Sequence, residues 1–279
     1  MHIVCCIKQV PDTAQVKIDP ETNTLIRSGV ESISNPYDVV ATETGVRLVE
    51  KHGGKVTIIS MGPPQAESAL RQCLSLGAAD AILLSDRAFA GADTLATSYT
   101  LARAISTIAA ADPVDLVICG RQAIDGDTGQ TGPGIATRLG YSHLPYVSEI
   151  VGVDIEQRTI TVKRLVEGGT ETVQARLPAL LTVELELATT RYASLPEMVR
   201  SLRQDMRVLG AAKIGAAVER VGIKGSPTWV RDISAPPAKK GGPVFLVSGG
   251  SDSGVEDFLR TIEAKEPELL QELLSKGRA

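Results

Sequence analysis

The sequence predicts an α/β fold in which a mostly parallel sheet carries helices on both faces. Short apolar runs rich in β-branched residues alternate with longer segments of helical periodicity through the first half of the chain, which is typical of successive βαβ units. The chain has 279 residues and is 43% apolar, so it is long enough to bury a large core. We therefore expect a large α/β domain, followed by an antiparallel extension of the sheet and a C-terminal arm.

The first part of the chain supplies a strand, a hairpin and a helix. Residues 2–7 form an apolar run that is typical of a central strand. Residues 16–29 alternate apolar and polar on both sides of an Asp-Pro and Asn-containing turn, which predicts an inserted antiparallel hairpin. Asn35-Pro36 predicts the start of a helix that ends at Gly53-Gly54. On this pattern alone, Asn35 is either a helix cap or a site residue.

Strands and helices then alternate as far as residue 140. The last of these helices should begin at Thr131 or Gly132, because Pro133 suits a first-turn position where its missing N–H costs nothing. Four strands that alternate with helices indicate a mostly parallel sheet covered on both faces. Besides residues 2–7, the predicted segments are strands 55–62, 78–86 and 113–119 and helices 63–77, 91–111 and 131–139.

The pattern changes at Tyr146. Residues 148–187 are rich in strand-forming residues, with a plausible hairpin turn at 167–170, and should extend the sheet in antiparallel fashion. We therefore expect a nucleotide-binding α/β domain over residues 1–190 and an arm over residues 191–279. The arm contains one short helical pattern, an apolar run at 244–250 and a final helix over 253–277. That helix either packs on the chain's own sheet or wraps a partner chain.

Composition excludes several classes of function. The net charge of −4, the mixed signs and the 3% aromatic content argue against a nucleic-acid partner. The cysteines form no C-x-x-C pair and the three histidines have no ligand spacing, so we expect reduced thiols and no metal site. No apolar stretch reaches membrane-spanning length and the N-terminus enters a strand directly, which predicts a cytoplasmic protein without a membrane segment.

The loop over residues 120–131 is the candidate functional site. It joins a buried strand to a helix whose free first-turn N–H groups and dipole favour an anion, and Gly132 and Gly134 allow a phosphate to approach the backbone. Asp127 and Thr128 are expected to shape the loop, while Gln130 and Thr131 can donate to a phosphate or a ribose hydroxyl. Ligands of α/β sheets bind at the carboxyl ends of strands. The end of the first strand therefore contributes three candidate residues for the wall of the site, Cys6, Ile7 and Lys8.

Other functions for this loop fit less well. A dinucleotide fingerprint fails because Gly132 and Gly134 lie far beyond the strand end and the third glycine is missing, and a P-loop lacks its Gly-Lys-Ser/Thr. Asp125 and Asp127 would suit Mg²⁺, yet no paired acid or nucleophile activator accompanies them. Elsewhere there is no G-x-S-x-G and no Cys with a credible His partner, so no catalytic side chain is predicted. An ordinary βα loop with turn-forming residues remains an alternative.

Several motifs together resemble the β subunit of electron-transfer flavoproteins. Residues 162–178 fit the family's signature of Val, Arg, acid, Gly-Gly, acid, aliphatic and Leu-Pro at every signature position. Four further motifs stand in the order in which the family places its nucleotide contacts: CIKQVPDT at 6–13, NPYD at 35–38, SMGP at 60–63 and GRQAIDGDTGQTG at 120–132. The chain is therefore identified as similar to this family over most of its length, which implies a Rossmann-like fold that binds an adenine nucleotide.

The resemblance also implies a partner and a cofactor site. Family members pair with an α subunit that carries most of the electron-transferring FAD site, while the β subunit holds a second adenine nucleotide. By position, the residues that would line the second site are Cys6, Asn35, Pro36, Tyr37, Asp38, Met61, Gly120, Arg121, Gln122, Ala123, Ile124, Asp125, Gly126, Asp127, Thr128, Gly129, Gln130 and Thr131.

The family divides by the identity of that second nucleotide. Members that only shuttle electrons hold AMP beside a loop resembling A-I-D-D-D-x-N-Q-T, and members that bifurcate electrons from NADH hold a second FAD. Gly126 replaces an acid of the AMP-type loop, and NPYD at 35–38 also resembles the bifurcating type, whereas Gln130-Thr131 is shared with the AMP type. FAD is thus favoured over AMP in this chain.

The resemblance further implies an electron carrier that works with an acyl-CoA dehydrogenase or another flavin dehydrogenase. The sequence RYASLP over 191–196 resembles the family's recognition loop, in which an apolar anchor corresponding to Leu195 inserts into that partner. The alternative for Leu195 is simple packing within the arm. The alternatives for the whole chain are a non-bifurcating subunit with a structural AMP, a regulatory nucleotide-binding module without redox activity, and an ATP-hydrolysing enzyme of similar topology.

Overall fold

The computed structural model describes residues 1–12, 17–18, 25–26, 32–229, 252–265 and 267. The chain divides into two compact units, Met1–Ala235 and Pro236–Ala279. Helix α6 (Asp252–Lys265) belongs to the second unit. The remaining description concerns the first unit. The predicted strand at 244–250 and the end of the predicted final helix lie outside the described residues.

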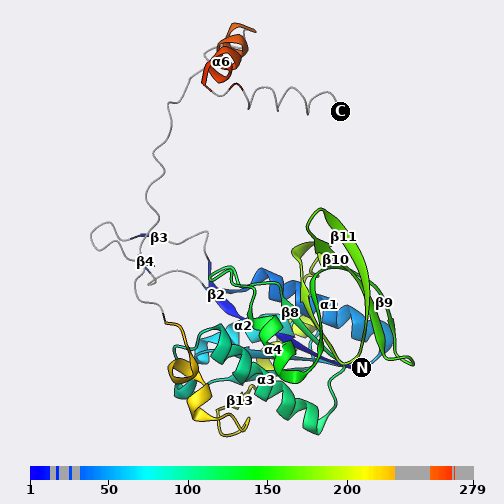
Figure 1. The fold of residues 1–279 in the computed structure, drawn as a ribbon. Helices are drawn as coiled ribbons and strands as arrows, with labels where there is room; N and C mark the ends of the chain where they lie inside the picture. The colour runs from blue at the N-terminus through cyan, green and yellow to red at the C-terminus, as the bar shows by residue number, and fades with distance from the viewer. Residues whose placement is uncertain (13–16, 19–24, 27–31, 230–251, 266, 268–279) are drawn as a thin grey trace. The chain divides into compact units, whose positions relative to one another are not determined.

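One large sheet forms the centre of the first unit (Figure 1). In spatial order the strands are β11 (Gly169–Arg176), β10 (Thr159–Val166), β9 (Ser142–Asp154), β12 (Ala179–Val183), β8 (Leu116–Gly120), β1 (His2–Cys6), β6 (Lys55–Met61), β7 (Asp80–Leu84) and β13 (Arg207–Leu209). In this spatial order, the strands from β9 across to β13 are mutually parallel, and β10 and β11 extend the sheet antiparallel beyond β9. The predicted mostly parallel α/β fold is confirmed. The prediction that residues 148–187 are antiparallel throughout is wrong for β12, which inserts between β8 and β9 and is parallel to both.

Helices cover both faces of the parallel part. Successive side chains of a strand point to opposite faces, so Ile3 and Cys5 of β1 pack on one face while Val4 and Cys6 pack on the other. The first face meets α1 (Pro36–His52) and α2 (Glu67–Leu74), and the second meets α3 (Thr94–Ala111) and α4 (Thr131–Leu139). The strands are buried on both sides, which explains their almost continuous apolar sequence.

Shorter elements complete the unit. The predicted hairpin is present as β3 (Lys17–Ile18) paired antiparallel with β4 (Leu25–Ile26), and β2 (Gln9–Pro11) pairs with β5 (Ser32–Ser34). After residue 190, α5 (Leu195–Arg203) packs on α2, and β13 joins the edge of the sheet beside β7. The 3₁₀ turns are η2 (Pro64–Ala66), η3 (Arg87–Phe89), η4 (Leu185–Leu187), η5 (Val218–Arg220) and η6 (Gly222–Gly225).

The order of the strands creates a switch point beside β1. The chain runs from β1 through β6 to β7 on one side, and α3 then returns it to β8 on the other side of β1. At such a point the connections leave adjacent strands in opposite directions and open a crevice at the carboxyl ends. The carboxyl ends of β1 and β8 are therefore where the fold itself provides a binding site.

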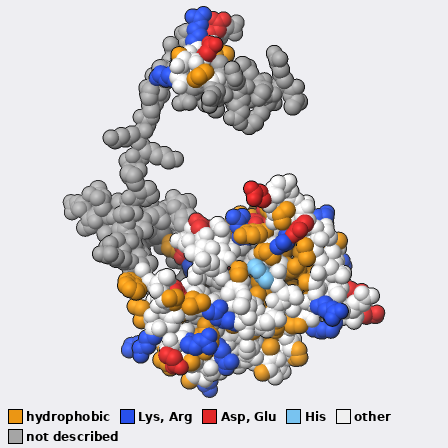
Figure 2. Space-filling view, in the orientation of Figure 1, with side chains coloured by type: hydrophobic (Ala, Val, Ile, Leu, Met, Phe, Trp, Pro, Cys, Tyr) orange, Lys and Arg blue, Asp and Glu red, His pale blue; other side chains and the backbone are white. Residues whose placement is uncertain are grey.

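The surface and the helices add two observations. In Figure 2, basic and acidic side chains lie in separate small groups among apolar and uncharged ones on the visible face of the first unit. Of the helices whose residues are described, none combines the length and the apolar content that crossing a bilayer demands.

Candidate functional site

A cavity of about 610 Å³ lies at the carboxyl ends of β1, β6 and β8. Its volume is within the range of about 300 to 1,000 Å³ that is typical of ligand sites. Loop 120–131 and the first turns of α3 and α4 frame it. The lining residues are Cys6, Ile7, Lys8, Asn35, Asp38, Met61, Ala92, Asp93, Thr94, Thr97, Leu101, Cys119, Gly120, Arg121, Gln122, Ala123, Gly126, Asp127, Thr128, Gly129, Gln130, Thr131, Gly132 and Thr228.

Asp38 joins the two strand ends at the switch point. Its carboxylate accepts hydrogen bonds from the backbone N–H of Lys8 at 2.8 Å and from that of Gly120 at 3.1 Å. Burial raises the pKa of Asp38 to about 7, against the opposing effect of these N–H donors. A Cβ atom at Gly120 would lie 2.4 Å from Asp38 Oδ1, so glycine is required for this approach. The N-terminus of α1 is thereby fastened to β1 and β8.

Asn35 holds the loop rather than capping the helix. Its side chain makes no capping hydrogen bond to α1, although Pro36 begins that helix as predicted. Instead, Asn35 Nδ2 donates to the carbonyl of Gln122 at 2.8 Å, and its Oδ1 accepts from the N–H of Ile124 at 3.2 Å. The side chain is almost fully buried. Asn35 thus does not cap α1 and shapes the wall of the cavity, and its contact with a nucleotide stays a prediction.

The carboxylates of the loop are engaged in bracing it. Lys8 Nζ donates to both oxygens of Asp125 at 2.7 Å, and Gln122 Nε2 donates to Asp127 Oδ1 at 2.9 Å. Asp127 itself has a φ of 51°, in the left-handed region that Asp tolerates better than most residues. No group of three or more His, Cys, Asp or Glu able to hold a metal ion occurs among the described residues. The Asp-Gly-Asp segment therefore serves the loop's conformation.

Two helix N-termini bound the polar side of the cavity. At α3, Asp93 caps the helix by accepting from the N–H groups of Leu95 and Ala96 at 3.0 Å. At α4, Gln130 stands in the cap position without a side-chain capping bond, and its Oε1 accepts from Thr94 Oγ1 at 2.9 Å. Unlike those of α3, the N–H groups in the first turn of α4 have no capping side chain as partner. The start of α4 therefore favours an anionic group.

Part of the cavity lining is apolar. Met61 and Leu101 line it together with the thiols of Cys6 and Cys119. Two causes raise the pKa of Cys119 well above the ordinary value: the hydrogen bond with the Cys6 thiol is the larger, and burial is the second. Both cysteines are free and buried. Cys119 is therefore a neutral wall residue, and the lining of the cavity combines apolar side chains with polar groups.

Most residues predicted for the site meet at this cavity, and four do not line it. Pro36 and Tyr37 lie in the first turn of α1 behind Gly120, while Ile124 and Asp125 lie in the outer part of the loop. Sequence reasoning left out Ala92, Asp93, Thr94, Thr97, Leu101, Cys119 and Thr228. Asp93-Thr94 had a usable signal, since an Asp cap after the strand at 80–84 places a helix start at the same edge of the sheet. Thr228 had none.

The predicted recognition residue lies outside the cavity. Leu195 begins α5 and has 73% of its side chain exposed, and the neighbouring Tyr192 is fully exposed. Ser194 caps the helix by accepting from the N–H of Glu197. Further along α5, Leu202 is also largely exposed, at 69%. The segment thus presents apolar side chains to solvent.

Comparison with known proteins shows which proteins the chain is similar to. The family described as "Electron transfer flavoprotein domain" matches residues 22–211. "Protein FixA" of Azotobacter vinelandii is 47% identical over 280 residues, which cover 99% of this chain and 100% of that protein. "Electron transfer flavoprotein subunit beta" of Thermoanaerobacterium thermosaccharolyticum is 44% identical and covers 95% of this chain and 99% of its own. The protein of that name from Megasphaera elsdenii is 42% identical and covers 92% and 96%.

Proposed function

The chain belongs to the electron transfer flavoprotein family as a β subunit, and the family implies an α-subunit partner. On this basis, we propose that its cavity holds an adenine nucleotide and that this nucleotide is FAD. The observation that carries the proposal is the cavity at the switch point between β1 and β8, framed by loop 120–131. The match to the family supports electron transfer as the activity of the complex.

The residues present fit such a group. Its ring would lie against the apolar wall that includes Met61 and Leu101, and its phosphates would lie against the backbone N–H groups at the start of α4. Gly132 brings that helix close to β12, since a Cβ there would lie 2.4 Å from Thr182 Cγ2. Gln130 and Thr131 line the cavity, and their side chains would donate to a phosphate or a ribose hydroxyl.

Gly126 favours FAD over AMP. It lines the cavity, and no atom lies within 4 Å of the position that a Cβ would take, so the loop leaves open space at this point. In the AMP-type loop an acid stands in its place. Absence of that carboxylate removes a negative charge beside an anionic ligand and leaves more room for a larger one. AMP in the same cavity is the alternative, because Gln130-Thr131 is common to both types.

Bound FAD supplies reversible one-electron and two-electron chemistry, and the chain's own residues bind it and exclude water. No acid or base from the loop is needed, because the flavin itself carries out the redox chemistry. Asp125 and Asp127 are instead engaged with Lys8 and Gln122. We further propose that the heterodimer, in the cytoplasm, transfers electrons between NADH or an acyl-CoA dehydrogenase and a second acceptor by flavin-based electron bifurcation. A regulatory nucleotide-binding module without redox activity is the alternative from another class.

Two surfaces are proposed to meet partners. Leu195, exposed at the start of α5, would be the anchor that a flavin dehydrogenase accepts in an apolar pocket. The C-terminal unit, which includes α6, is proposed to pack on the α subunit. Exposed Phe258 and Leu259 on α6 are apolar side chains that such an interface would bury.

The nucleotide content of the heterodimer tests the proposal. The chain is purified with its α partner, the nucleotides are released, and flavin and AMP are counted per heterodimer. Two FAD molecules are expected. One FAD with one AMP would establish simple electron transfer, and a complex without flavin would overturn the electron-carrier assignment altogether.

A pair of variants at one position tests the role of Gly126. Gly126→Asp adds a carboxylate in open space and should lower the FAD content of the β site in favour of AMP, whereas Gly126→Asn adds the same size without the charge and should retain more FAD. Equal FAD content in the wild-type protein and both variants would contradict the role given to Gly126.

A variant at Asp127 tests the role of that residue in shaping the loop. Asp127→Ala removes the hydrogen bond from Gln122 and should weaken nucleotide retention.

A further inference from the structure

A buried carboxylate that the cavity does not use lies in the middle of α1. The side chain of Glu43 has no exposed surface, and a charge so placed requires partners. Its carboxylate accepts from Arg47 Nε at 2.6 Å and from Arg191 Nε at 2.9 and 3.2 Å, and it also accepts from the backbone N–H of Arg191 at 3.3 Å. Burial tends to raise the pKa of Glu43, and the bonds from both arginines outweigh it, so that the pKa is lowered.

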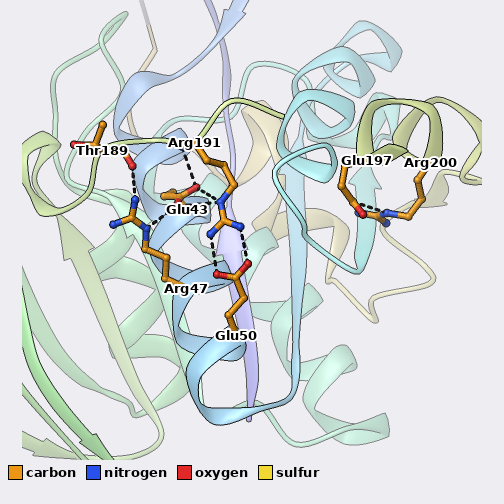
Figure 3. A network of polar contacts seen from close by, with 7 residues as sticks. All are labelled: Glu43, Arg47, Glu50, Thr189, Arg191, Glu197 and Arg200. Carbon is orange, nitrogen blue, oxygen red and sulfur yellow. Dashed lines mark hydrogen bonds and ion pairs between the residues drawn. The ribbon is translucent and has the colours of Figure 1, made fainter. Parts of the chain in front are cut away.

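The same arginines carry the contact further along both segments. Arg191 donates from its two terminal nitrogens to Glu50, at 2.5 and 2.9 Å, and Arg47 donates to the carbonyl of Thr189 at 2.6 Å. Figure 3 shows this network, in which side chains on successive turns of α1 grip the segment that approaches α5. We call Glu43, Arg47, Glu50 and Arg191 the α1 clamp.

A second set of contacts holds the chain after Leu195. Arg200 donates to the carbonyls of Leu74 and Ala78, both at 2.8 Å, and so ties α5 to α2 and the turn that follows it. Arg71 of α2 donates in return to the carbonyls of Ser201, Leu202 and Gln204. Residues 192–195 therefore lie between two anchored residues, Arg191 and Arg200, and the side chains of Tyr192 and Leu195 in this stretch are exposed.

We propose that Glu43 is a positioning residue that acts through Arg191 to hold residues 189–195 in the conformation that presents Leu195 to a partner dehydrogenase. This inference rests on the docking role proposed for Leu195. Residues 188–194 form no helix or strand of their own, so side-chain contacts must fix their conformation. A segment that is already ordered avoids the entropic cost of ordering on binding, which shows as tighter association with the partner.

The chemistry of the clamp suits orientation better than stability. Apolar residues of similar volume would often stabilise the fold as well as a buried ion pair does. A guanidinium, however, has a planar fork of fixed donors, and here that fork spans two carboxylates, Glu43 and Glu50, which lie about two turns apart on one helix. The direction in which the chain leaves residue 191 is thereby defined. Lys at the same position would keep the charge and lose the fork.

The test uses the nucleotide-loaded heterodimer and an acyl-CoA dehydrogenase as electron donor. The rate of heterodimer reduction is measured against heterodimer concentration for Glu43→Gln and Arg191→Lys. Both should raise KM by about tenfold to a hundredfold, leaving kcat within about twofold and the nucleotide content unchanged. Glu50→Gln should have a smaller effect, because the Glu50 side chain is 54% exposed and its pairing is screened by water. Arg176→Lys, an exposed residue of β11, is the control.

A double-mutant cycle separates this inference from the proposed docking role. If Glu43 acts through Leu195, then Leu195→Ala should itself raise KM, and adding Glu43→Gln to it should raise KM little further. A raised KM for Leu195→Ala with unchanged values for Glu43→Gln and Arg191→Lys would overturn the clamp alone. An unchanged KM for Leu195→Ala would overturn the docking role and the inference with it. Fully additive effects would show that Glu43 acts elsewhere.

Amide hydrogen exchange supplies a measurement that needs no partner. In Glu43→Gln, exchange should become faster at residues 189–195 and stay unchanged in loop 120–131, because the clamp and the cavity are braced by different side chains. Unchanged exchange at 189–195 would overturn the positioning role whatever the dehydrogenase is. A general loss of protection, or a loss of bound nucleotide, would assign Glu43 to the stability of the fold instead.

Discussion

Asp38→Asn should change the pH dependence of stability in a direction that the structure fixes. The folded-state pKa of Asp38 is raised from 3.8 to about 7 by burial. Between these values the folded chain keeps a proton that the unfolded chain releases, so the free energy of unfolding falls as the pH rises through this window and levels off above it. From pH 5 to pH 8 the contribution of Asp38 falls by about 2–3 kcal/mol.

The asparagine variant removes this titration and keeps the shape of the side chain. Its single oxygen can accept from the N–H of Lys8 or from that of Gly120 but not from both, and the unpaired donor costs about 1–3 kcal/mol at every pH. That cost cancels when the two pH values are compared. The wild-type protein should therefore lose about 2–3 kcal/mol relative to Asp38→Asn between pH 5 and pH 8.

Urea unfolding of the heterodimer at pH 5 and pH 8, at fixed protein and nucleotide concentration, measures this difference. Asp205→Asn serves as the control, because it makes the same substitution at an exposed residue that does not line the cavity. A gap between wild type and Asp38→Asn that stays constant, or that widens in favour of the wild type toward pH 8, would refute the reasoning.

Three further substitutions probe the frame of the cavity. Asn35→Ala removes two hydrogen bonds to partly buried backbone groups of the loop, so it should lower the free energy of unfolding by about 1–3 kcal/mol and speed nucleotide release, as measured by urea unfolding and by the rate of loss on dilution. Gly132→Ala places a methyl group 2.4 Å from Thr182 Cγ2, which should displace α4 and lower nucleotide retention, whereas a normal nucleotide content would show that the helix adjusts freely. Lys8→Met breaks an ion pair with Asp125 whose lysine side chain is half exposed, so the urea midpoint should shift little while nucleotide release becomes faster; a large shift would contradict this.

The parallel core could be predicted from sequence because its signals are local. Each of three elements can be recognised from a few consecutive residues. They are β1 by its apolar run, α1 by the Asn-Pro at its start, and α4 by the proline in its first turn. Strand β13 could not be predicted in this way. It has three residues, begins with Arg207 and exists because it pairs with β7, so its structure depends on a neighbour distant in sequence.

The start of β9 was misplaced for a similar reason. The sequence predicts β structure from residue 148, whereas β9 runs over Ser142–Asp154 and pairs with β12 before it pairs with β10. Tyr146 has a φ of 56°, and the register of the pairing with β12 shifts nearby, so the strand contains an irregularity that breaks its alternation. A pattern of period two cannot be recognised across such a point.

The site was predictable as a place more than as a set of contacts. Loop 120–131 and the ends of β1 and β6 could be combined because parallel strands bring their carboxyl ends to one edge. The role of Asn35 could not be foreseen, since its partners at 122 and 124 lie almost ninety residues away in the sequence. Thr228 reaches the cavity through a hydrogen bond of 2.7 Å to Asp93, which only the folded chain creates.

The division of labour around the cavity explains why a polar loop need not be a catalytic one. Most polar side chains of the loop region hydrogen-bond to one another or to the backbone, namely those of Asn35, Lys8, Gln122, Asp125 and Asp127. The groups that remain available to a ligand are backbone N–H groups, glycines and small polar side chains. These groups fit the nucleotide phosphate proposed for the cavity, because backbone N–H groups at a helix start bind anions. Substitutions in the loop should therefore act on how firmly the nucleotide is held, and those in the α1 clamp on how firmly a partner is. The two groups of variants are separable because no hydrogen bond or ion pair of the described residues joins Glu43 to the loop.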